Sequence, residues 1–262
     1  TGVPTMSAEL QRAAQATTRD LSTLAEVFAG GAARPADQVE KIAGTFKKTA
    51  PGLGYGLTET NALGAFSSGV LYLANPSSTG RAVPAVTEFK IIDSTGNHLG
   101  PDEIGEVCMK PPANAVGYWN KPEATAVAFV DGWFHTGDLG KLDENGFLSI
   151  VDRIKDIIIR GGENISCIEV EAGICSHPQV LEAAVFGVPD ERLGEAVGAV
   201  VVVSGELKEP LQSLQAYLKD HLAAFKIPAY VWVNEGSLPR TATGKIFKRE
   251  LKQHYNATLS AA

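Results

Sequence analysis

The stretch DRIKDIIIRGGENI, residues 152–165, separates two parts of the chain that differ in character. Its first five residues carry four charges, its middle is a run of three isoleucines, and its end is a pair of glycines followed by Glu163 and Asn164. The β-branched run predicts a short buried strand. The two glycines predict a turn whose backbone another group can approach closely. The stretch therefore predicts a polar connection that leads into a new strand and turn.

Composition places the chain among ordinary globular proteins. It has 262 residues, of which 44% are hydrophobic and 20% charged, enough for one large domain or two modest ones. The net charge of -7 argues against a nucleic-acid partner, and no apolar run approaches the roughly 20 residues of a membrane span. The N-terminus lacks the basic and apolar regions of a signal peptide. Cys108, Cys167 and Cys175 have no metal-ligand spacing and are expected to be core residues in a reducing cytoplasm.

The first third of the chain predicts an α/β unit. Ser7 is expected to cap a helix that runs to about Leu21. An apolar strand then ends in Gly30-Gly31, and a helix follows from Pro35. Such units bind ligands just past the carboxyl end of the strand. Residues 61–84 are rich in small residues and proline and are expected to form a loop.

Two polar segments carry candidate ligand-binding side chains. In GYGLTET, residues 54–60, Tyr55 lies between glycines with a face open to ring stacking, and Glu59 offers a carboxylate oxygen to magnesium. In Thr136-Gly137-Asp138, the carboxylate of Asp138 either accepts hydrogen bonds from two vicinal hydroxyls or serves as a turn aspartate. His135 is expected to be structural, because no nearby residue pairs with it to make a base. Short strands between residues 87 and 152 predict a small barrel or a twisted sheet.

The last 110 or so residues predict a small α+β domain. Strands are expected at residues 180–188, 195–203 and 230–233, the second of them central because it is almost entirely β-branched. Helices are expected at residues 166–176, 209–222 and 244–255. The C-terminal basic run, Arg240 to Lys252, is either a solvated helix face or a cationic element for a polyanion such as ATP or CoA.

Four stretches together resemble the adenylate-forming enzymes: acyl-CoA synthetases, peptide-synthetase adenylation domains and luciferases. They are YGLTET at 55–60, GYWNKPEATAVAFVDGWFHTGDLG at 117–140, DRIKDIIIRGGENI at 152–165 and LPRTATGKIFKREL at 238–251. The resemblance implies an α/β plus α+β fold. It implies that residues 1–152 are the C-terminal part of the large AMP-binding domain, with an α/β unit and a small β-barrel-like subdomain. Residues 153–156 would be the hinge and residues 157–262 a small mobile C-terminal domain.

The resemblance also implies roles for individual residues. Those assigned to the reaction are Lys245, Thr58 and Glu59, with Glu59 also as the metal ligand. Those assigned to nucleotide, acyl or CoA binding are Gly30, Gly31, Ala32, Gly54, Tyr55, Gly56, Asp138, Arg153, Gly161, Gly162 and Glu163. Lys155 is expected to be the hinge pivot. Lys245 is the expected catalytic lysine, a cation that offsets the charge built up when a carboxylate attacks a phosphate.

The implied activity is ATP-dependent conversion of a carboxylic acid, expected to be a fatty acid, to an acyl-adenylate and then to a CoA thioester. The cofactors and co-substrates would be ATP, Mg²⁺ and CoA. The phosphate-binding loop that relatives carry upstream is not found in this sequence, so we expect a fragment, inactive alone, whose partner is the missing N-terminal part. A homodimer is a further possibility. The alternatives are an adenylation domain that loads a carrier protein, a luciferase-type oxidase and a non-catalytic fragment.

Overall fold

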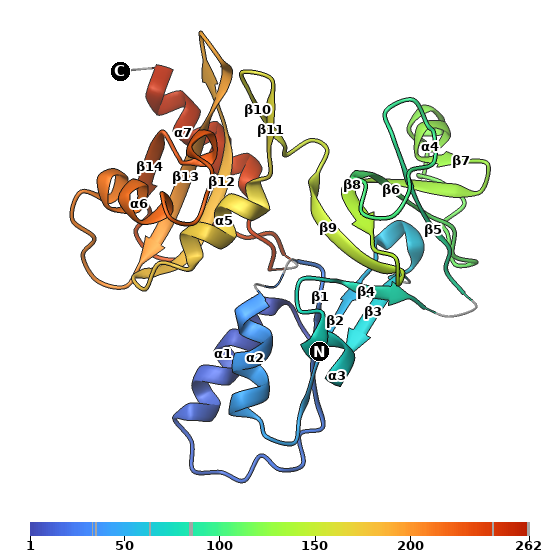
Figure 1. Cartoon of the computed structure of the whole chain (residues 1–262), viewed down its shortest axis with the longest axis horizontal. Coiled ribbons are helices and arrows are strands. Elements are labelled where there is room, and N and C mark those ends of the chain that lie inside the picture. The colour runs from blue at the N-terminus through green and yellow to red at the C-terminus, as the bar shows by residue number, and fades with distance from the viewer. Residues whose placement is uncertain (33, 35, 63, 84–85, 243, 261–262) are drawn as a thin grey trace. The chain divides into compact units, whose positions relative to one another are not determined.

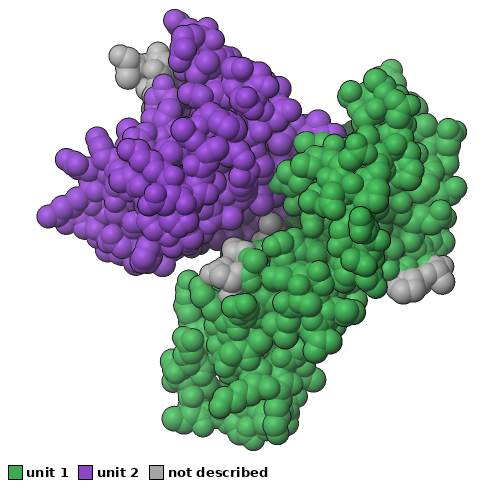
Figure 2. Space-filling view, in the orientation of Figure 1, with its two compact units in different colours: residues 1–151 green, residues 152–262 purple. Residues whose placement is uncertain are grey.

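The computed structural model describes residues 1–32, 34, 36–62, 64–83, 86–242 and 244–260 of the chain (Figure 1). The chain forms two compact units, Thr1–Val151 and Asp152–Ala262 (Figure 2). The division falls inside strand β9, Phe147–Arg153, where we predicted the first domain to end. The use of residues 153–156 as a hinge stays a prediction.

Among the described residues of the first unit, nine strands form one sheet, with β7 paired to β8 beside the path β1-β2-β3-β4-β9-β8-β6-β5. The strands are β1 Glu26–Gly30, β2 Ala50–Tyr55, β3 Ala65–Ser68, β4 Gly80–Ala82, β5 Phe89–Ile92, β6 Gly105–Met109, β7 Phe129–Val130, β8 Trp133–Leu142 and β9. The helices are α1 Pro4–Gln15, α2 Ala36–Thr45, α3 Gly69–Ala74 and α4 Pro122–Ala128, with a 3₁₀ turn η1 at Thr58–Thr60. The strands expected in a barrel-like subdomain thus lie at the outer end of a continuous sheet.

Two expectations for this unit are wrong in detail. Helix α1 begins at Pro4 and not at Ser7, because proline is pre-organised for the first helical turn. Ser7 is instead buried, and its hydroxyl accepts a hydrogen bond from the Arg34 guanidinium at 3.2 Å. The expected loop at 61–84 contains β3, α3 and β4, because small residues there form ladders with β2 and β9.

The second unit is a sheet of strands β10 Ile158–Arg160, β11 Glu163–Ile165, β12 Val180–Asp190, β13 Gly194–Val203 and β14 Tyr230–Val233. The order of the first four is β11-β10-β13-β12, and β14 also pairs with β13, which confirms that β13 is central. The helices are α5 Cys167–Cys175, α6 Pro210–Leu218 and α7 Lys248–Ser260, with a 3₁₀ turn η2 at Ala224–Lys226. Strand residues alternate between two cores, as a period of two requires. Val185 packs with α5 and α6, whereas Phe186 packs with α7.

Two sequence predictions for this unit need correction. The isoleucine run is not a buried strand: Ile158 is buried, but Ile159 is 58% exposed, because β10 and β11 form a short hairpin at the end of the sheet. Helix α7 begins at Lys248 and not at Gly244. The residues before it are held in a β-bridge between Arg240 and Ile246, and the Phe247 amide donates to the Pro239 carbonyl.

Candidate functional site

The two glycine-containing segments of the first unit lie side by side. Strands β1 and β2 are parallel, and their register pairs Gly30 with Gly54 at the carboxyl ends. This edge is where open α/β sheets bind ligands. A side chain at Gly56 would place a Cβ atom 2.4 Å from the carbonyl oxygen of Ala62, so the turn after β2 requires glycine. The structure therefore brings two predicted segments together at one sheet edge.

Asp138 lies in an irregularity of strand β8. Glu106 pairs with Leu139 and Cys108 pairs with His135, so one residue of β6 lies opposite three residues of β8. Such a bulge re-aims a side chain, and bulges are common beside active sites. Gly137 at its centre has φ +69°, a conformation that favours glycine. The bulge thus turns Asp138 out of the regular alternation of the strand.

The carboxylate of Asp138 is held by Tyr55. The Asp138 side chain is 5% exposed, and its Oδ2 accepts a hydrogen bond of 2.7 Å from the Tyr55 hydroxyl. The two residues are 83 positions apart in the sequence, in different predicted segments. Sequence reasoning assigned Tyr55 a stacking role and did not anticipate this bond. The phenol orients one carboxylate oxygen, as a positioned polar site requires.

Tyr118 is a functional candidate that sequence reasoning missed. Its hydroxyl donates a hydrogen bond of 2.8 Å to Oε1 of Glu59, and the Ala115 amide donates to the Glu59 carbonyl at 2.7 Å. Burial, together with the neighbouring Glu59 carboxylate, raises the pKa of Tyr118 to about 12, so the phenol stays protonated and continues to donate. Tyr118 belongs to the GYW motif quoted above, which was the signal that could have identified it. Glu59 still offers its second oxygen, the hard donor that Mg²⁺ prefers.

His135 does have partners, contrary to the expectation from the sequence. Its Nδ1 lies 3.1 Å from Oε2 of Glu106 and 3.7 Å from Sγ of Cys108. The other oxygen of Glu106 accepts from the Gly137 amide at 3.0 Å, so Glu106 ties His135 to the bulge. Burial and the Glu106 charge raise the pKa of the Cys108 thiol to about 12, with Lys90 opposing.

In the second unit, Lys245 lies at the end of a tightly held turn. The Thr241 amide donates to the Lys245 carbonyl at 2.8 Å, and the Gly244 amide donates to the Thr241 carbonyl at 2.9 Å. Arg240 braces the turn, because its guanidinium donates to the Gly244 carbonyl and pairs with Glu182 of β12 at 2.9 Å. The side chain of Lys245 is exposed. These bonds thus hold the backbone of Lys245, whose long side chain extends into solvent as a cation. Thr243 lies outside the described residues.

The basic run around Lys245 is largely neutralised within its own unit. Besides Arg240, Lys248 pairs with Glu171 at 2.6 Å and Lys252 pairs with Glu195 at 3.4 Å. Within the described part of the chain, Lys245 and Arg249 are the cations of this run without an ion pair. The run is therefore not a uniformly available cationic surface, because three of its five cations are paired within the second unit.

The pair Lys248–Glu171 joins α7 to α5 and β12. The Val185 amide also donates to Glu171 at 2.8 Å, and the two side chains are only 25% and 20% exposed. Burial raises the pKa of Glu171. For Lys248, burial acts in the opposite direction, but the charge of Glu171 leaves the pKa above its ordinary value. The pair therefore holds the beginning of α7, the helix that follows Lys245, against α5 and β12.

Replacing Lys248 by methionine is expected to lower the free energy of unfolding of the second unit by about 3–5 kcal/mol, because Glu171 is left buried without its partner. Chemical denaturation followed by circular dichroism measures this loss. Lys252→Met is the matched control, with an expected cost below about 1 kcal/mol for a more exposed pair. The double variant Lys248→Met/Glu171→Leu should recover most of the stability; equal losses in the single and double variants would contradict the assignment.

The remaining predicted site residues lie around the start of the second unit. Gly161 and Gly162 form the two-residue turn of the β10–β11 hairpin, both with positive φ, and Glu163 pairs with Arg160 across it. All of 161–164 are exposed. Arg153 is exposed at the end of β9. The structure thus confirms a glycine turn here, and the contact of this turn with CoA stays a prediction.

Lys155 occupies a turn that the neighbouring buried Asp152 anchors. The amides of Asp156 and Ile157 donate to the Arg153 carbonyl at 3.0 and 3.2 Å, so neither closing bond uses the Lys155 amide. Asp152 is 1% exposed and accepts from the Ser166 hydroxyl and the Ile168 amide, which ties it to the beginning of α5. The turn therefore follows directly after a fixed residue, Asp152, and begins with the exposed residues 153–155.

Comparison with known proteins identifies the family. The AMP-binding enzyme family matches residues 1–119, and the AMP-binding enzyme C-terminal domain matches residues 169–245. The chain is 39% identical over 254 residues to a long-chain-fatty-acid–CoA ligase of Bacillus subtilis, covering 95% of this chain and 44% of that enzyme. It is 42% identical over 205 residues to a fatty acid–acyl-carrier-protein ligase of Streptomyces coeruleorubidus, covering 77% of this chain and 39% of that enzyme.

A solved structure of o-succinylbenzoate–CoA synthetase from Bacillus subtilis, in complex with an acyl-adenylate intermediate, matches with a TM-score of 0.85 and 35% identity. The match covers 96% of this chain and 50% of that one, and another structure of the same enzyme holds ATP and a magnesium ion. The chain spans about a third to a half of the length of the curated relatives it matches. In the described residues, every helix is too short or too polar to cross a membrane. The fold, the ordered motifs and both domain matches agree: the chain belongs to the AMP-binding, adenylate-forming enzyme family.

Proposed function

We propose that this chain is the C-terminal part of an AMP-forming acyl-CoA synthetase. The enzyme would join a carboxylic acid to the α-phosphate of ATP, releasing pyrophosphate, and then pass the acyl group from AMP to the thiol of CoA. The observation that carries the proposal is the sheet edge of the first unit. There Gly30 lies beside Gly54, and Asp138 is bonded to Tyr55 at 2.7 Å.

In this proposal, the first unit binds the nucleotide. The Tyr55 ring stacks on adenine, and Asp138 accepts hydrogen bonds from the ribose hydroxyls, with one carboxylate oxygen already oriented by Tyr55. Gly30, Gly31 and Ala32 leave room for the acyl and nucleotide groups. Glu59 and Thr58 would hold Mg²⁺ and a phosphate oxygen, and Tyr118 fixes the Glu59 carboxylate. When bound, the metal would offset the negative charge of the phosphates.

The second unit supplies the catalytic cation and a second surface. Lys245 approaches the reacting carboxylate and phosphate and stabilises the charge that develops between them. Rotation about Lys155 then withdraws Lys245 and brings residues 161–164 to the path of the CoA thiol, with Arg153 near the ribose or phosphate. Lys245 and the glycine turn are both exposed, as this alternation requires.

The proposed substrate is a fatty acid. The relatives from Bacillus subtilis and Streptomyces coeruleorubidus both act on fatty acids by name, whereas the solved relative takes an aromatic acid. The Streptomyces coeruleorubidus relative is named as an acyl-carrier-protein ligase, which is a specific reason to consider a carrier protein as an alternative acceptor. CoA is preferred here because the longer match, over 95% of the chain, is to a CoA ligase.

The test uses the complete enzyme, with the coding sequence upstream of Thr1, beside the 262-residue chain. We expect ATP–pyrophosphate exchange with long-chain fatty acids in the complete enzyme, thioester formation with CoA, and no exchange in the chain alone. Aromatic acids and an acyl carrier protein are the comparison substrate and acceptor. If none of the carboxylic acids supported exchange in the complete enzyme, the proposed activity would be refuted. Acyl transfer to the carrier protein but not to CoA would establish the alternative acceptor.

A further inference from the structure

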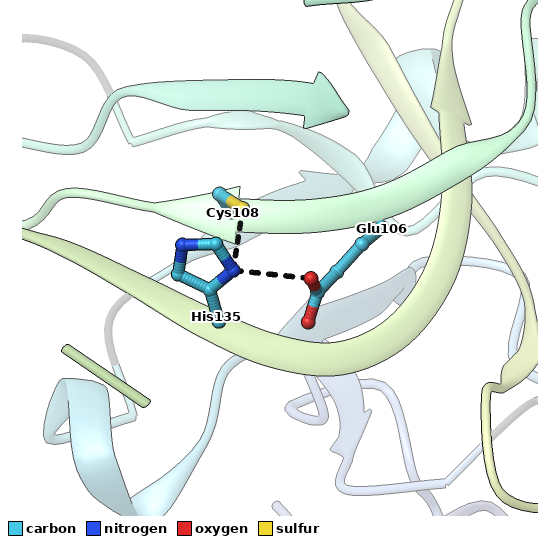
Figure 3. Close-up of side chains that lie close together, drawn as sticks. All are labelled: Glu106, Cys108 and His135. Atoms are coloured by element: carbon cyan, nitrogen blue, oxygen red, sulfur yellow. Dashed lines mark hydrogen bonds and ion pairs between the residues drawn. The ribbon is translucent and has the colours of Figure 1, made fainter. Parts of the chain in front are cut away.

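Three potential metal ligands meet on one face of the sheet in the first unit. Glu106 and Cys108 are two positions apart on β6 and therefore point to the same face, and His135 on β8 pairs directly with Cys108 across the ladder. Figure 3 shows Nδ1 of His135 directed at both the Glu106 carboxylate and the Cys108 sulfur. The three ligand atoms all lie within 4.8 Å of one another.

The spacing of these atoms suits a tetrahedral cation. Zinc binds sulfur at about 2.3 Å and nitrogen or oxygen at about 2.0–2.2 Å, so tetrahedral ligand atoms lie about 3.3–3.6 Å apart. The observed separations are 3.7 Å from Nδ1 to Sγ and 3.1 Å from Nδ1 to Oε2. The third separation, from Oε2 of Glu106 to Sγ of Cys108, is at most 4.8 Å. The site already approaches the shape of three corners of a tetrahedron.

The donor set and its surroundings select the class of ion. A thiolate, an imidazole and one carboxylate suit zinc, whereas Mg²⁺ and Ca²⁺ require several oxygen ligands. The Gly137 amide holds the far oxygen of Glu106 at 3.0 Å, the kind of outer contact that orients a metal-bound carboxylate. The side chains of His135 and Glu106 are 23% and 21% exposed, so water can reach a fourth position.

We propose that Glu106, Cys108 and His135 form a binding site for one zinc-type divalent cation with an open fourth position. The bound ion would cross-link β6 to β8 beside the bulge that carries Asp138, and so stiffen that bulge. This site is separate from the magnesium ligand Glu59 and makes no use of the nucleotide. It needs only residues of the present chain, so it can be tested whatever the complete enzyme does.

The experiment titrates Co²⁺, as a spectroscopic substitute for zinc, into the reduced 262-residue chain. We expect one equivalent to produce thiolate-to-cobalt charge-transfer absorption and the intense visible bands of a four-coordinate ion, both abolished by competing Zn²⁺. The melting temperature should rise with zinc concentration, because an ion that binds the folded state stabilises it.

Variants assign the ligands. Cys108→Ser should lose the charge-transfer absorption, and His135→Gln should weaken binding by at least about 100-fold, beyond the 10–100-fold typical of outer contacts. Cys175→Ser, in the second unit, is the matched control and should bind as the parent does. Absence of the charge-transfer band in the parent chain, or its persistence in Cys108→Ser, would overturn the site. If Cys108→Ser fails to fold, unchanged Co²⁺ binding in His135→Gln would also overturn the proposed site.

Discussion

Lys245→Ala in the complete enzyme is expected to slow acyl-adenylate formation by a factor on the order of 10²–10³, the usual loss when one positioned charge stabiliser is removed. The side chain is exposed, and the Arg240 guanidinium braces its turn by donating to the Gly244 carbonyl, so truncation of Lys245 removes the cation without disturbing this support. ATP–pyrophosphate exchange measures the loss. Thioester formation from supplied acyl-adenylate should be spared, because in the proposed domain rotation Lys245 would have left the site before that step.

The matched control for this prediction is Arg249→Ala. Arg249 is another exposed cation of the same basic run, and its guanidinium lies 5.4 Å from the Phe247 ring. The proposed reaction assigns Arg249 no role, and an exposed surface charge contributes little. Exchange in Arg249→Ala should therefore stay within about twofold of the parent rate. A comparable fall in both half-reactions of Lys245→Ala would show that the lysine has no specific part in adenylation.

Lys155→Pro in the complete enzyme should block CoA-dependent turnover while pyrophosphate exchange survives. Proline fixes φ near -65°, and a hinge needs a change of φ or ψ at one or two residues. The bonds that close the turn come from the amides of Asp156 and Ile157, so the substitution removes neither. Proline at the third position of such a turn also restricts Ile154, so the melting temperature must be measured alongside.

Lys155→Ala separates the backbone from the side chain in this experiment. It removes the charge but leaves φ free, so both half-reactions should remain near the parent rate if the backbone is what pivots. Both half-reactions are measured at matched concentrations of folded protein. Equal retention of the two in a normally melting Lys155→Pro enzyme would exclude Lys155 as the pivot.

Local pattern was sufficient for several features of this chain. Apolar and β-branched runs predicted β12 and β13, because a strand whose two faces both pack into cores needs apolar residues on each side. The Gly161-Gly162 pair predicted a turn, since both residues adopt positive φ at little steric cost. The four motifs identified the family, because they preserve residue types in order along the chain.

Local pattern failed where long-range pairing competes with propensity. The small residues of 61–84 read as a loop, yet β3 and β4 form there because neighbouring strands supply hydrogen-bond partners. Ile159 was expected inside, but its strand lies in a terminal hairpin and leaves it 58% exposed. Burial depends on which neighbours a strand acquires, and the strand itself does not encode them.

By itself, the sequence determined the fold class, the family and the candidate residues, because these depend on residue type, order and short-range periodicity. Only the tertiary structure decided which of those residues meet. It joined Tyr55 to Asp138, Glu59 to Tyr118, and Glu106 and Cys108 to His135. The physical reason is that each contact spans elements distant in the chain, and strand register together with the bulge in β8 determines which side chains face one another.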